Sequence, residues 1–172
     1  MINYLPMLTA ILLIIIVVIS RILPHFPNFS PLVAVALFSG VYIRKRYAFL
    51  IPLGAYIISD LIVGLHDVVI FTWSSILVIY FIGYFLKRRT FWSVFVWTIF
   101  SSILFFIITN LGVWIMGWYP RTFSGLIQCY TFAIPFFRTS LISDLMYVGV
   151  LFGVYELILR KSKAVLEKPV LL

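Results

Sequence analysis

The stretch that decides the fold runs from Val69 to Met116 and reads VIFTWSSILVIYFIGYFL, KRRT, FWSVFVWTIFSSILFFIITNLGVWIM. Two runs without a charged residue flank the basic cluster Lys87-Arg88-Arg89. A helix needs about 20 mostly apolar residues to cross the hydrocarbon core of a bilayer, and both runs suit that length. The stretch therefore predicts two membrane-spanning helices joined by a basic turn.

The rest of the chain repeats this pattern. We expect six helices over residues 5–23, 31–43, 47–65, 69–86, 91–116 and 136–159, followed by a basic tail over residues 160–172. Hydrophobic residues make up 64% of the chain and charged residues 10%, whereas soluble domains carry roughly 45–50% and about 25%. We predict an all-α fold: a polytopic membrane helical bundle of about six transmembrane helices in a single domain, residues 1–172.

The net charge of +8 would suggest nucleic acid if it formed a patch on a soluble domain. Ten of the thirteen Lys and Arg instead fall in three clusters, at 44–46, at 87–89 and in the tail from Arg160 to Lys168. Basic loops are retained on the cytoplasmic side of a membrane. We therefore expect a multi-pass protein of the cytoplasmic membrane with both termini in the cytoplasm, and no nucleic-acid partner.

Charged residues also fall inside the predicted helices, where a charge costs about 2.5–3.5 kcal/mol on insertion scales. Asp60 lies in the outer half of the third helix, and Asp144 lies at a similar depth in the sixth, which begins near Arg138. One interpretation is a structural ion pair, such as Arg138 with Asp60, that fixes helix packing. The other is a polar floor beneath a ligand pocket.

Aromatic rings, amides and a guanidinium gather around the first and fifth outer loops, at His25, Phe26, Asn28, Phe29, Ser30, Trp114, Trp118, Tyr119, Arg121, Gln128 and Tyr130. Such groups suit a planar or heterocyclic solute with an anionic group. Trp and Tyr also collect at membrane interfaces as anchors, which is the simpler interpretation of Trp118-Tyr119. We expect an outward-facing pocket bounded by Asn28, Asp60, Asn110, Trp114, Arg138 and Asp144. Trp114 would stack on the solute, and Arg138 would meet its anionic group.

Motifs of catalysis are missing from the sequence. Cys129 is the single cysteine, and His25 and His66 lack the spacing of metal ligands. The chain has no GxSxG, no HExxH and no phosphate-binding glycine loop. We therefore expect no enzyme activity, no metal and no cofactor.

Several strings resemble those of an uncharacterised family of small bacterial membrane proteins: Asn28-Phe29-Ser30-Pro31, Leu37-Phe38-Ser39-Gly40, Ser59-Asp60-Leu61, Thr109-Asn110-Leu111-Gly112-Val113-Trp114 and Pro135-Phe136-Phe137-Arg138. The similarity covers about Arg21 to Gly153. The six-helix plan with polar outer loops also resembles the substrate-binding S components of energy-coupling factor (ECF) transporters. The Ala-x-x-x-Ala docking motif of those proteins is absent, because the first helix has only Ala10.

The resemblance implies a substrate-binding membrane component of a micronutrient uptake transporter, which captures a small, vitamin-like solute at the outer face. It also implies a shared transmembrane coupling subunit with cytoplasmic ATPases as partners, beside the lipid bilayer. The alternative is a structural or accessory subunit of a larger membrane complex that binds no free solute.

Overall fold

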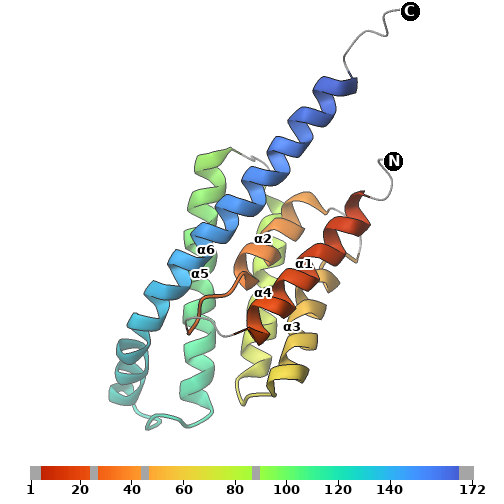
Figure 1. The fold of residues 1–172 in the computed structure, drawn as a ribbon. Coiled ribbons are helices and arrows are strands. Elements are labelled where there is room, and N and C mark those ends of the chain that lie inside the picture. The colour runs from red at the N-terminus through yellow and green to blue at the C-terminus, as the bar shows by residue number, and fades with distance from the viewer. Residues whose placement is uncertain (1–4, 24–26, 44–46, 87–89, 167–172) are drawn as a thin grey trace, which may run out of the picture.

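The computed structural model describes residues 5–23, 27–43, 47–86 and 90–166 (Figure 1). Its helices are α1 (Leu5–Ile22), α2 (Leu32–Tyr42), α3 (Leu50–Val63), α4 (Val69–Phe85), α5 (Phe91–Ile115) and α6 (Phe123–Leu166). The described residues contain no strand, so the all-helical prediction is confirmed. His25 and the basic residues at 44–46, 87–89 and 168 lie outside the described residues.

The helices alternate in direction along the chain. Arg21 at the end of α1 contacts Asp60 near the end of α3, and Trp118 after α5 donates to Asp67 after α3. We call this the polar end of the bundle. Tyr42 at the end of α2 donates to Glu156 in the last third of α6, at the opposite end. Figure 1 shows the turns after α3 and α5 at the bottom, while α1 begins and α6 finishes at the top.

The largest departure from the sequence-based expectation is the start of α6. We predicted a loop up to Pro135, a helix over 136–159 and a tail over 160–172. Instead, α6 runs from Phe123 to Leu166 and contains Pro135, so residues 160–166 of the predicted tail are helical as well. Contacts with α5 hold its first turns in place: the Tyr130 hydroxyl donates to the carbonyl of Ile107 at 2.7 Å, and Cys129 Sγ lies 3.4 Å from the carbonyl oxygen of Asn110. Pro135 therefore does not mark the start of the helix, as the sequence-based prediction assumed.

Within the described parts of the chain, two helices are long and apolar enough to cross a membrane by length and composition, over Phe91–Ile115 and Phe123–Leu159. The apolar helices over Ile11–Ile22, Leu32–Tyr42, Leu50–Val63 and Val69–Phe85 are shorter.

The centre of the bundle is α2, which contacts all five other helices. Ten of its residues, Leu32 through Val41, are buried. Because α2 fills the middle, the ends of α1 and α3 and the middle of α6 are held around the polar end of the bundle, where Arg21, Asp60 and Asp144 lie.

Candidate functional site: a polar cavity at one end of the bundle

A buried ion pair anchors the polar end. Arg21 Nη1 lies 2.6 Å from Asp60 Oδ1 and donates to the Ser59 hydroxyl at 2.8 Å. Its guanidinium also lies over the Tyr56 ring, 4.4 Å from the centroid. Asp60 is fully buried, and the indole of Trp73 donates to its second carboxylate oxygen at 2.8 Å. Arg21 is thus a cation from α1, held in place by α3.

A cavity of about 370 Å³ lies beside this ion pair. It combines charged and polar groups with aromatic rings, and its lining is Arg21, Asn28, Tyr56, His66, Val68, Thr72, Ser102, Phe105, Phe106, Thr109, Asn110, Val113, Ala133, Phe136, Phe137 and Ser140. We call it the polar cavity. Its volume falls at the lower end of the range for small-molecule sites, about 300–1,000 Å³.

A smaller cavity of about 170 Å³ adjoins the polar cavity. We call it the inner cavity. The two share the lining residues Arg21, Asn28, Tyr56, Phe105 and Ser140. The inner cavity alone reaches Ser30 and Asp144, and the Ser30 hydroxyl is a buried group without a hydrogen-bond partner among the described residues.

The structure gathers four of the six predicted site residues at this place. Asn28 and Asn110 line the polar cavity, Asp144 lines the inner cavity, and Asp60 lies directly behind Arg21. Asn28 has a left-handed backbone, with φ of 62°, a conformation that Asn tolerates better than most residues. The amide nitrogen of Asn110 donates to the Phe106 carbonyl at 2.8 Å, one turn earlier on α5.

The other two predicted residues lie outside the lining of both cavities. The Trp114 indole donates to the Pro120 carbonyl at 3.0 Å in the α5–α6 turn. Arg138 is exposed on α6. The predicted Arg138–Asp60 ion pair is wrong, because Arg21 occupies the place beside Asp60.

Sequence reasoning missed Arg21, Tyr56, His66 and Thr72 as cavity residues. Arg21 carried a usable signal, since it is the charged residue in the last turn of an otherwise apolar helix. Tyr56 had a weaker one, because it precedes Asp60 by one helical turn and therefore shares its face. The cavity role of His66 and Thr72 depends on how α3 and α4 are placed and has no local signature.

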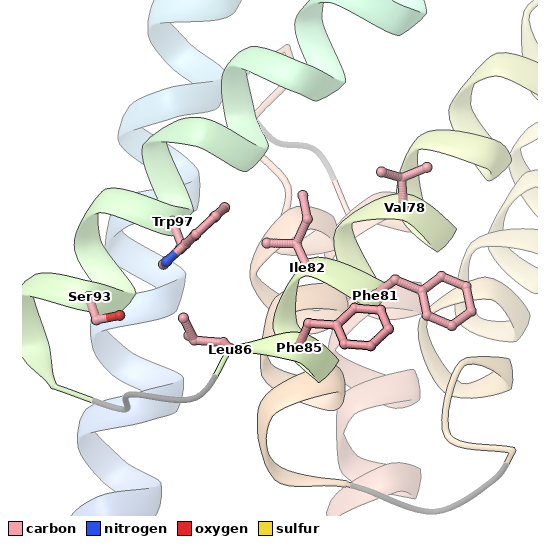
Figure 2. Close-up of a pocket in the computed structure, with 7 residues that line it drawn as sticks. All are labelled: Val78, Phe81, Ile82, Phe85, Leu86, Ser93 and Trp97. Carbon is pink, nitrogen blue, oxygen red and sulfur yellow. The ribbon is translucent and has the colours of Figure 1, made fainter.

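Two larger cavities lie toward the opposite end of the bundle, and each measures about 600 Å³. Figure 2 shows one of them between α4 and α5, where Val78, Phe81, Ile82, Phe85, Leu86 and Trp97 leave Ser93 as the one polar side chain among the labelled residues. The other lies between α5 and α6 and includes Val94, Leu145, Val148 and Glu156. We call this second one the apolar cavity of α6.

Comparison with known proteins gives one result. Residues 3–167 match the model of a family described as a family of unknown function (DUF6580). No curated protein and no solved structure matches the chain.

Proposed function

We propose that this chain, which belongs to the DUF6580 family, is a multi-pass membrane protein that captures a small solute in the polar cavity. The observation that carries the proposal is the cavity itself. It is a pocket of about 370 Å³ that combines a guanidinium, an imidazole, amides, hydroxyls and aromatic rings inside a bundle with an apolar exterior.

The distribution of polarity supports a location in the bilayer. Large apolar side chains are exposed on every helix except α2; among them are Ile19 (49%), Leu61 (66%), Phe85 (72%), Trp92 (71%) and Val150 (59%). Among the residues whose burial is described, the interior instead holds ten polar or charged ones, namely Ser39, Ser59, Asp60, Thr72, Ser75, Thr98, Ser101, Ser102, Ser143 and Asp144. An apolar exterior around a partly polar interior suits a lipid solvent, since lipid tails do not penalise exposed apolar area.

The lining supports a planar, heteroaromatic solute. Tyr56, Phe105, Phe106, Phe136 and Phe137 offer ring faces and edges for stacking. Asn28, Asn110 and Thr109 offer hydrogen-bond donors and acceptors. Because the Arg21 charge is balanced by Asp60, the site suits a solute with little net charge, or one weak anionic group beside Arg21.

These features fit the resemblance to the S components of ECF transporters, which capture vitamin-like micronutrients at the outer membrane face. The described residues contain no nucleotide-binding loop, so movement of a solute across the bilayer needs an external source of energy. A shared transmembrane subunit with cytoplasmic ATPases is the partner that the resemblance implies.

Native mass spectrometry of the detergent-purified protein, before and after denaturation, tests the proposal. We expect a small molecule that co-purifies with the wild type and is lost in Ala133→Phe, which places a ring in the polar cavity. Val150→Phe, on the exposed face of the same helix, is the matched control and keeps the ligand. Arg138→Ala also keeps it, because Arg138 does not line the cavity.

A co-purifying molecule that survives Ala133→Phe would overturn this assignment of the site. The rival function, an accessory subunit, is favoured by the open apolar cavity in Figure 2, which suits a partner's side chain. That rival is supported if other membrane subunits co-purify stably and no small molecule is found. In that case Ala133→Phe should leave the co-purification of those subunits unchanged.

A further inference from the structure

The dipeptide Ser-Asp occurs at 59–60 and 143–144, but the two carboxyls have opposite surroundings. Asp60 has a guanidinium at 2.6 Å and an indole donor at 2.8 Å. Asp144 is equally buried, at 1% exposure, and its one hydrogen-bond partner among the described residues is the Ser102 hydroxyl at 2.7 Å. Asp60 is therefore neutralised by a cation, and Asp144 is not.

The hydrogen bonds of Ser102 indicate which form of Asp144 fits. Ser102 Oγ lies 2.7 Å from Asp144 Oδ2 and 3.0 Å from the carbonyl oxygen of Thr98. A hydroxyl has one proton to donate, and a carbonyl can only accept. Both contacts are hydrogen bonds at once when Ser102 donates to Thr98 and Asp144, carrying a proton, donates to Ser102.

The charged groups around Asp144 favour the same form. The α5 helix that faces it has no ionisable residue, and α2 has only Tyr42, which contacts Glu156 at the opposite end. Across the inner cavity lie Tyr56 and Arg21, and Arg21 is paired with Asp60; His66 lines only the larger polar cavity. A buried carboxylate with a single hydroxyl donor is costly and accepts a proton instead.

The position of Asp144 beside a cavity gives its proton a place to leave the protein interior. Asp144 lines the inner cavity, which adjoins the polar cavity. On its other side, the apolar cavity of α6 begins at Leu145 and Val148, the next residue and the next turn of the same helix. Asp144 thus lies on α6 between a cavity of the polar end and a cavity of the opposite end.

We infer that Asp144 is a proton-binding site: it holds a proton in this conformation and releases it to water in the inner cavity. This inference rests on the proposed function, because the inner cavity adjoins the polar cavity that would hold the solute, so release of the proton changes the charge beside the solute. Release leaves a carboxylate that faces Arg21 across the inner cavity.

Infrared spectroscopy of the full chain in liposomes, without added solute, tests the inference. The chain has five acidic side chains, so the carbonyl stretch of a protonated carboxyl can be assigned. At neutral pH we expect one such band, absent in Asp144→Asn and retained in Asp67→Asn, which changes an exposed carboxylate. Glu156→Gln assigns any second band from the residue beside Tyr42. Alkaline pH should abolish the Asp144 band reversibly.

Ser102→Ala keeps the test decisive if Asp144→Asn does not fold. Loss of the Ser102 hydroxyl should shift the frequency of the band without removing it, because the proton stays on Asp144. The inference fails if the wild type has no band that Asp144→Asn removes, since Asp144 would then be ionised. It also fails if the band keeps its intensity at alkaline pH, since Asp144 would then not release its proton to water. Neither result depends on solute binding, so the proposed function is judged separately by mass spectrometry.

Discussion

At the scale of single residues, Asp60 is the point where three helices meet. Asp60 belongs to α3, forms an ion pair with Arg21 of α1 and accepts a hydrogen bond from the Trp73 indole of α4. Removing one partner of a buried ion pair leaves an uncompensated charge, which costs about 3–5 kcal/mol, whereas replacing both partners is often neutral. We expect Arg21→Met to destabilise the protein by about that amount, and Arg21→Met with Asp60→Leu to restore most of it. Thermal unfolding in a mild detergent measures both, and additive losses in the double variant would contradict the pairing.

The Trp73 indole makes a separate contribution at the same carboxylate. Hydrogen bonds to charged groups are worth about 1.5–3 kcal/mol. Trp73→Phe keeps the ring and removes the donor to Asp60, so we expect a loss of stability in that range, measured by the same unfolding assay. Trp97→Phe is the control, because Trp97 is 38% exposed on α5. Equal losses in the two variants would mean that the Trp73–Asp60 bond contributes nothing.

The sequence predicted these residues unevenly. Asp60 and Asp144 were identifiable because a carboxylate in an apolar helix needs a reason, and both line or adjoin a cavity. The choice of cation failed, because Arg138 and Arg21 both lie near a predicted outer helix end. Only the parallel packing of α1 on α3 brings Arg21 to Asp60. The spacing of residues along one helix cannot show which neighbouring helix packs against a given side chain.

At the scale of elements, five of the six predicted helices begin and end within a few residues of α1 to α5. Uninterrupted apolar runs and the basic or polar residues between them carry that information. The start of α6 could not be found this way, because Gln128, Tyr130 and Pro135 have the composition of a loop. Their helical state depends on contacts with α5, such as the bond from Tyr130 to the Ile107 carbonyl.

The crossing of α2 and α4 gives a prediction at this scale. A Cβ at Gly40 would meet the backbone of Tyr80 and lie 2.7 Å from the nitrogen of Tyr84, and Gly83 faces the backbone of Leu37 in return. Neither backbone can move without separating the helices, so we expect Gly40→Ala to cost about 1–3 kcal/mol or more. Gly149→Ala is the control, since nothing lies within 4 Å of its Cβ position. It should be neutral or stabilise by about 0.5–1 kcal/mol through helix propensity.

At the scale of the whole molecule, the alternation of the helices places the polar cavity and the two larger cavities at opposite ends of the bundle. The polar cavity lies where α1, α3 and α5 end, and the apolar cavities lie where α2 and α4 end. The basic residues at 44–46 and 87–89 follow α2 and α4 in the chain. If they are retained in the cytoplasm, the polar cavity faces outward, where an uptake protein meets its solute.

Cysteine labelling in intact cells tests this orientation. Cys129 is buried, and Cys129→Ser gives a background without cysteine. In that background we expect Asp67→Cys and Arg121→Cys, both exposed at the polar end, to react with a membrane-impermeant maleimide added outside. Thr90→Cys, exposed at the opposite end, should react only after the membrane is opened. Reversed labelling would place the polar cavity on the cytoplasmic side, where it could not capture an external solute. Labelling of all three from outside would contradict a spanning bundle altogether.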